Sequence, residues 1–168
     1  ISNGAKGEEL YVPRDIRKAY ENGTRSRDGK PGPKYWQNHA SHTMRITLNP
    51  PSKRVEGEQE IIYTNNSPEP LTVLAFRLYM NAHQPEALRD KNYGTQFLND
   101  GITVEEFSID GKPLAWNAPD DPFPLLNQRG STVHVVALQN PLPPKGNVRV
   151  KMRWRYDLVR DLGWKEGA

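Results

Sequence analysis

The segment from Val148 to Tyr156 constrains the fold of this 168-residue chain more than any other. Apolar and basic side chains alternate along it. The apolar set is Val148, Val150, Met152, Trp154 and Tyr156, and the basic set is Arg149, Lys151, Arg153 and Arg155. A period of two places the two sets on opposite faces of a β-sheet. A slip of one residue would bury the cations, so the pattern predicts a strand with a single register.

Weaker alternation predicts five further strands, separated by turn signals. They are His42 to Leu48, Arg54 to Thr64, Leu71 to Met80, Ile102 to Ile109 and Thr132 to Leu138. The turn Asn65-Asn66-Ser67-Pro68 favours an antiparallel meander of the first three strands. Asp110-Gly111 is a strong signal for a two-residue hairpin. Gln84 to Asp90 is either a short helix or a loop, and Asn117 to Phe123 is irregular.

The first 38 residues differ from the rest, because they are polar and rich in loop-forming residues. One short helix is predicted there, from Arg14 to Glu21, with Pro13 at its start. We expect residues 1–38 to be an extended arm that wraps a β-domain formed by residues 39–168. The predicted fold class is all-β, an antiparallel sandwich or a saddle-like pair of curved sheets.

Composition narrows the classes of function only a little. The chain has no cysteine, which excludes disulfides and a thiol nucleophile. Its net charge of +3 does not indicate a nucleic-acid partner. No segment approaches the ~20 apolar residues of a membrane span. Because the chain begins with Ile1, a removed export signal remains open, and we favour an exported protein over a cytoplasmic one.

The histidines do not form a recognisable metal motif. His39 and His42 lie three apart, which on a strand means opposite faces. Neither they nor His83 and His134 belong to a His-Glu-x-x-His sequence. We therefore interpret them as ordinary polar residues and predict no metal, cofactor or catalytic residue in this chain.

The charged and aromatic candidates each have two interpretations. Glu56, Glu58 and Glu60 alternate on one strand, whereas Glu105 and Glu106 are predicted to point to opposite faces. The glutamates of the first strand could pair with the basic row across a sheet, or the row could bind an anionic partner. In Lys34-Tyr35-Trp36 the aromatic rings could stack on a sugar or anchor the arm. Ser131 follows Gly130 in a loop and belongs to no nucleophile motif.

Several segments resemble one protein family. They are Val12-Pro-Arg-Asp-Ile-Arg-Lys-Ala-Tyr, Met44-Arg-Ile-Thr-Leu-Asn-Pro-Pro, Val55-Glu-Gly-Glu-Gln-Glu-Ile-Ile-Tyr, Leu74-Ala-Phe-Arg-Leu-Tyr-Met-Asn and Leu142-Pro-Pro-Lys-Gly. Together they resemble the N-terminal β-domain of the aminopeptidase-N family of zinc metallopeptidases, in a bacterial branch whose members are often exported. The resemblance implies a β-domain that packs against a thermolysin-like catalytic domain.

The motifs that carry the family's chemistry are missing here. Neither the zinc motif nor the Gly-x-Met-Glu-Asn motif for the substrate's amino terminus occurs in the sequence. The resemblance implies that both lie in a catalytic domain after Ala168, which would hold zinc and cleave peptides. We expect this chain to be the non-catalytic front domain of that protein. The alternatives are a stand-alone binding module using Tyr35, Trp36 or Trp116, and an enzyme with dispersed acidic residues.

Overall fold

The computed structural model describes residues 11–89 and 94–159 of the chain. It divides into two compact units, Ile1–Gln37 and Asn38–Ala168. In the first unit, α1 (Arg14–Glu21) confirms the predicted helix. Pro13 is its N-cap, and the Pro13 carbonyl accepts the first helical hydrogen bond, from Arg17 N–H at 3.0 Å.

The described part of the first unit folds back on itself and is not an extended arm. The amides of Gly32 and Lys34 donate to the carbonyls of Thr24 and Gly23. Gly23 has a φ of 73°, a left-handed conformation that glycine adopts without strain. These bonds close the segment after α1 into a small hydrogen-bonded loop.

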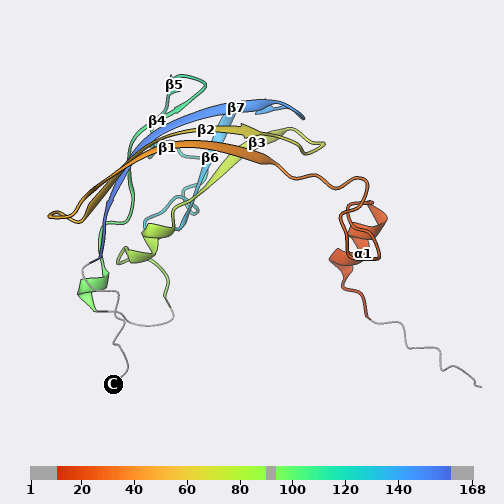
Figure 1. Cartoon of the computed structure of the whole chain (residues 1–168), viewed down its shortest axis with the longest axis horizontal. Coiled ribbons are helices and arrows are strands. Elements are labelled where there is room, and N and C mark those ends of the chain that lie inside the picture. The colour runs from red at the N-terminus through yellow and green to blue at the C-terminus, as the bar shows by residue number, and fades with distance from the viewer. Residues whose placement is uncertain (1–10, 90–93, 160–168) are drawn as a thin grey trace, which may run out of the picture. The chain divides into compact units, whose positions relative to one another are not determined.

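The second unit is built of two antiparallel sheets (Figure 1). The large sheet has the order β1-β2-β7-β4-β5, with β1 (His39–Asn49), β2 (Arg54–Thr64), β7 (Asn147–Asp157), β4 (Thr103–Ile109) and β5 (Lys112–Pro113). The small sheet pairs β3 (Leu71–Arg77) with β6 (Val133–Leu142), and the 3₁₀ helices are η1 (Tyr79–His83) and η2 (Thr95–Phe97). The predicted all-β class, with antiparallel sheets and one short α-helix, is confirmed.

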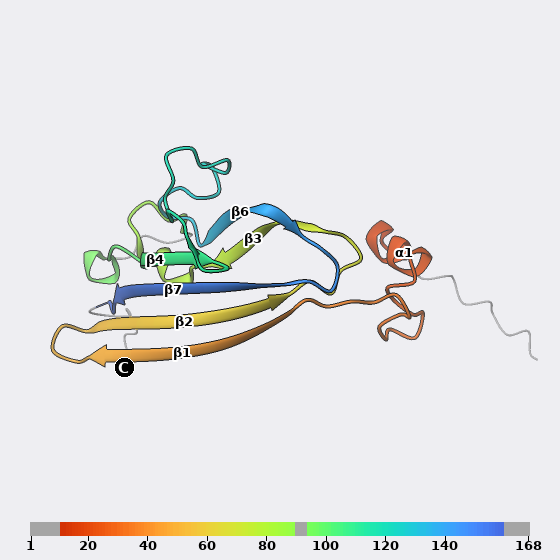
Figure 2. The same ribbon diagram turned by 90° about the horizontal axis from the view of Figure 1, so that it is seen from above.

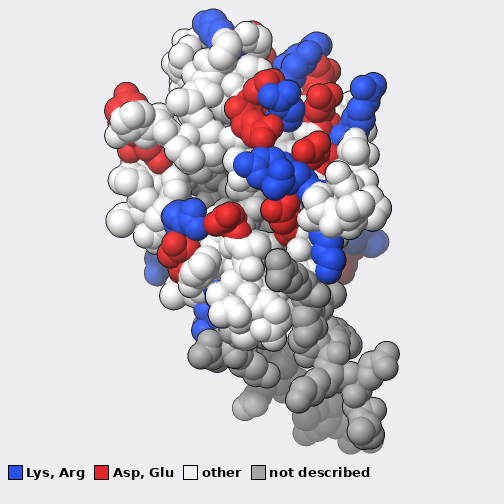
Figure 3. Space-filling view, turned by 90° about the vertical axis from the view of Figure 1, so that its left-hand side faces the viewer, with Lys and Arg blue, Asp and Glu red and all other residues white. Residues whose placement is uncertain are grey.

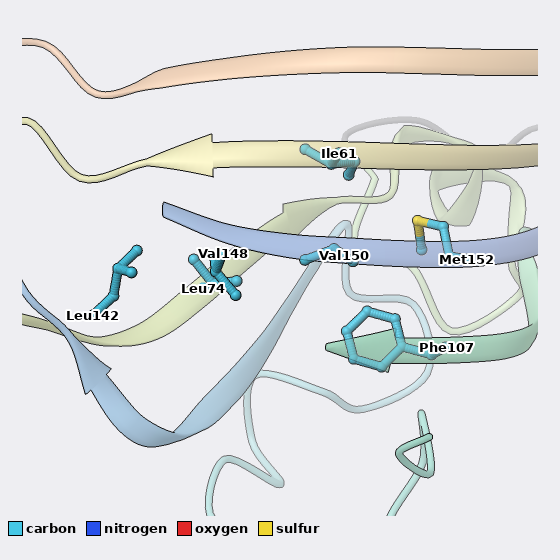
Figure 4. Packing of buried hydrophobic residues seen from close by; sticks show 7 residues of the cluster. All are labelled: Ile61, Leu74, Phe107, Leu142, Val148, Val150 and Met152. Carbon is cyan, nitrogen blue, oxygen red and sulfur yellow. The ribbon is translucent and has the colours of Figure 1, made fainter. Parts of the chain in front are cut away.

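The alternating segment occupies the middle of the large sheet, as β7 between β2 and β4. Its apolar side chains point to the face that the small sheet partly covers, and Val150 is 1% exposed. A cluster of buried residues joins the two sheets (Figure 4). Its members are Ile61, Leu74, Phe107, Leu142, Val148, Val150 and Met152. Because both sheets contribute to this cluster, it fixes the strand register that the alternation predicted.

The predicted meander is wrong at its third strand. β3 ends at Arg77, and the chain continues as η1 instead of extending to Met80. β3 also leaves the large sheet and pairs with β6, while β7 takes the place beside β2. β6 in turn runs on to Leu142, beyond the predicted end at Leu138. It accommodates Pro141 because an edge strand can lack an N–H donor on its open side.

Asn65 holds the turn at which β3 departs. Its side chain is completely buried, and its amide group donates to the carbonyls of Glu69 and Leu142, both at 2.9 Å. Its side-chain oxygen accepts hydrogen bonds from the amide and hydroxyl of Ser67. The two loops that connect the sheets are therefore joined through one side chain.

The predicted hairpin at Asp110-Gly111 is confirmed between β4 and β5. Both residues have positive φ, 49° and 79°, as a type I′ turn requires. Asp110 also accepts a hydrogen bond from the amide of Arg149 at 2.9 Å, which connects the turn to β7.

Candidate functional site

The apolar face of the large sheet is only partly covered. The small sheet packs on residues of β7 and β4, and Figure 2 shows β3 and β6 on the side of β7 away from β1. Met44, Ile46 and Leu48 of β1 are 54%, 57% and 54% exposed. These three side chains share the face that is buried elsewhere in the sheet. We refer to Met44, Ile46 and Leu48 as the β1 strip.

A groove of about 630 Å³ separates the β1 side of the large sheet from β3. Its floor includes Ile61 of β2 and Met152 and Trp154 of β7, and its wall is formed by β3 and by Leu78, which follows it. Among the described residues that line this groove, Arg77 alone is charged at neutral pH. We call this feature the β3 groove.

Trp154 lies flat across β2 because its partner there is a glycine. Gly57 pairs with Trp154 in the register of β2 and β7. A Cβ atom built on Gly57 would lie less than 3.0 Å from three carbons of the indole ring. The ring also stacks on Tyr156, with centroids 5.9 Å apart. This packing gives the uncovered half of the face a flat aromatic floor.

The opposite face of the large sheet is charged. The register places Glu60, Glu58 and Glu56 of β2 opposite Lys151, Arg153 and Arg155 of β7. Of these glutamates, Glu60 forms ion pairs, with Lys151 at 3.2 Å and with Arg149 at 3.6 Å. The prediction that the glutamates of β2 pair with the basic row is therefore confirmed for Glu60.

Glu105 and Glu106 depart from the sequence prediction. Both reach Arg153, Glu105 at 3.3 Å and Glu106 at 2.5 Å, and Glu105 also pairs with Arg155 at 2.8 Å. They therefore share one face and do not point to opposite ones. The reason is a register shift between Val104 and Glu106, since a β-bulge inserts an extra residue and turns the next side chain. Figure 3 shows acidic and basic side chains interleaved on the side of the molecule that it displays.

An ion pair at the end of the sheet connects β2 to β7. Arg54 Nε donates to Asp157 at 2.8 Å, and a second nitrogen of Arg54 donates at 3.2 Å. This hydrogen bond, helped by the charge of Arg54, lowers the pKa of Asp157. The same bond raises the pKa of Arg54.

The histidines lie apart from one another in separate environments. His39 and His42 are exposed on opposite faces of β1, as predicted. His83 lies within 3.0 Å of the Phe97 carbonyl through Nδ1. Across residues 11–89 and 94–159, no group of three or more histidine, aspartate or glutamate side chains is placed to hold a metal ion.

His134 is the buried histidine, and it stacks on Trp116 with ring centroids 3.9 Å apart. Burial lowers the pKa of His134, while the Asp121 carboxylate and a hydrogen bond to the Trp116 backbone act in the other direction. Trp116 also packs against Phe76 and Phe107 in edge-to-face geometry. Trp116 is thus half-buried and takes part in the packing between the sheets.

Tyr35 and Trp36 of the first unit are 52% and 44% exposed. Whether they anchor that unit on the β-sheets or bind a ligand stays a prediction. Ser131 serves the loop alone, because its hydroxyl donates to the carbonyl of Val133 at 2.8 Å. Neither the β1 strip nor the β3 groove was predicted as a site, and the alternation in β1 gave the one available signal.

These features define an all-β protein with one charged face and one partly covered apolar face. The chain matches no protein-family model, no curated protein and no solved structure in our comparisons. Within the described segments, no helix is both long and apolar enough to cross a membrane.

Proposed function

We propose that this chain is a non-catalytic front domain of a zinc aminopeptidase, and that its two sheets form an incomplete sandwich that packs against further polypeptide of the same protein. The observation that carries the proposal is the β1 strip. Three large apolar side chains on one face, each more than half exposed, are typical of a surface that another domain covers. The zinc-holding residues would lie in the downstream catalytic domain.

The charged face of the large sheet also supports docking through the apolar face. The cations of β7 on this face are held in ion pairs with neighbouring glutamates, so this side of the sheet is suited to solvent. The apolar side, by contrast, leaves β1 without a second layer. A sheet normally buries one face against another layer of secondary structure. Docking through the β1 side would complete that arrangement and help to form one wall of the substrate cleft.

The direct test compares this chain with the longer gene product. We expect bound zinc and release of amino-terminal residues from peptides by the longer protein, and neither by the 168-residue chain. Stoichiometric zinc and turnover in the short chain would contradict the proposal. So would a longer gene product that has neither.

A pair of variants tests the docking surface itself. Ile46→Lys places a charge in the β1 strip, whereas the matched control Thr47→Lys places it on the opposite, charged face. We expect Ile46→Lys to lower the melting temperature of the longer protein but not that of this chain. Equal effects of the two variants in the longer protein would contradict docking through the strip.

The alternative, a sugar-binding module, depends on the exposed rings of Tyr35 and Trp36. It predicts binding to a glycan array that is lost on Trp36→Ala. Glycan binding by this chain, together with the absence of an encoded catalytic domain, would favour the alternative over the peptidase proposal.

A further inference from the structure

The small sheet has a free edge that faces the β3 groove. Within the described residues β3 pairs with β6 alone, so one side of β3 carries backbone N–H and C=O groups without a strand partner. No described residue of β6 lines the groove, whereas every residue of β3 except Thr72 lines it. The unpaired edge and the apolar groove are therefore parts of one surface.

From this geometry we infer that the β3 groove binds an extended polypeptide segment, which adds to the edge of β3 as a third strand of the small sheet. Addition of a strand to an open edge uses backbone hydrogen bonds for affinity and alternating side-chain positions for selectivity. The inward side chains of the segment would pack on Ile61, Met152 and Trp154, which line the groove from the large sheet. This inference concerns the edge of β3 and holds whether or not the parent protein is a peptidase.

Charge selects the chemistry of the segment. Leu74 and Phe76 of β3 point toward the large sheet, and Arg77 is exposed on the alternate, outer side. The guanidinium of Arg77 forms no ion pair or side-chain hydrogen bond with any described residue. An acidic side chain on the outer face of the added strand, directly across from Arg77, would pair with it. The bound segment is thus a strand with apolar residues on its inward face and an acidic residue on its outer face, across from Arg77.

The other open edge, β1, fits such a segment less well. A strand added beside β1 would extend the large sheet into a region where no second layer faces it, because every residue of β1 is exposed. Its apolar side chains would remain open to water. A strand added to β3 gains contacts from the small sheet and from the large sheet together, so the β3 edge is the preferred site.

The test uses designed peptides and the complete 168-residue chain. The probe is a synthetic peptide of about nine residues, long enough to span β3, in which valine alternates with threonine and a glutamate takes the outward-facing polar position near the end that lies across from Arg77, the last residue of β3. One comparison peptide carries lysine in place of the glutamate. Another has the glutamate peptide's composition with its valines grouped together. Binding is followed by NMR, through slowed amide exchange and contacts to the methyl groups of Ile61.

We expect slowed exchange along β3, and about threefold tighter binding of the glutamate peptide than of the lysine peptide. The grouped peptide should bind at least several-fold more weakly than the alternating one. Arg77→Glu should reverse the preference between glutamate and lysine. The matched control Arg45→Glu, an exposed arginine on the β1 edge, should leave that preference unchanged.

Several results would overturn the inference. These are the absence of binding, protection confined to β1, equal binding of the alternating and grouped peptides, and a preference that follows Arg45 instead of Arg77. They are distinct from failure of the peptidase proposal, which depends on zinc and turnover in the longer protein.

Discussion

Replacing Gly57 with alanine tests the packing of Trp154 across β2. The new methyl group would lie less than 3.0 Å from three carbons of the indole ring, so the ring has to move. Forcing an extra carbon into a packed contact costs about 1–3 kcal/mol. Removing glycine from a regular strand returns about 0.4–1 kcal/mol by restricting the unfolded chain. We therefore expect a net loss of about 1–2 kcal/mol in the free energy of unfolding.

Urea unfolding followed by far-UV circular dichroism provides the assay. With a urea slope of about 2 kcal/mol per molar, the midpoint should fall by about 0.5–1 M. The decisive control is the same substitution in a Trp154→Val background, where the methyl group no longer meets a ring. There Gly57→Ala should be neutral or slightly stabilising.

A double-mutant cycle of Gly57→Ala and Trp154→Val distinguishes a clash with the ring from other causes. If the clash is the cause, the two substitutions should couple by about 2 kcal/mol, because the new methyl group meets the indole ring only while Trp154 is present. Effects that add to within about 0.5 kcal/mol would show that Gly57 is required for a reason unrelated to Trp154.

Three further outcomes follow from the buried and paired polar groups. Asn65→Ala should lower the free energy of unfolding by about 3 kcal/mol or more in urea titrations, because several buried backbone and hydroxyl groups lose their hydrogen-bond partner. A loss below about 1 kcal/mol would contradict this prediction. The lowered pKa of His134 means that the unfolded chain binds a proton more readily, so stability should fall as the pH drops from about 7 toward 5, and a His134→Gln variant should show a smaller fall. The pKa of Asp157 measured by NMR should be below its ordinary value and should rise in Arg54→Gln, and an unchanged pKa in the variant would contradict the assigned cause. The stability contributed by this pairing is present above the pKa that Asp157 has in the unfolded chain, and it is lost as the pH falls through the pKa of the folded protein.

Local patterns predicted most of the strands and their faces. β2 has the predicted bounds, β7 exceeds them by one residue at each end, and the turn at Asp110-Gly111 has the predicted backbone. These features depend on side-chain alternation and on left-handed φ values, which neighbouring residues determine. One predicted charged partner of β7, Glu60, was also found, because acidic and basic side chains on adjacent strands attract one another.

The candidate site could not be predicted in the same way. The position of β3 depends on which strand occupies the place beside β2, and that competition is settled by residues far apart in the chain. The shared face of Glu105 and Glu106 depends on a bulge that no alternation reveals. Trp116 was a candidate platform, but packing placed it against His134.

What the sequence determined by itself is the two-faced character of each strand, because alternation acts over neighbouring residues. The tertiary structure alone decided how much of the apolar face is covered. Two strands of the small sheet reach across β4 and β7 but leave the β1 strip and the β3 groove open. The extent of that cover is set by the pairing of β3 with β6, a contact between segments about 60 residues apart, and no local pattern encodes it.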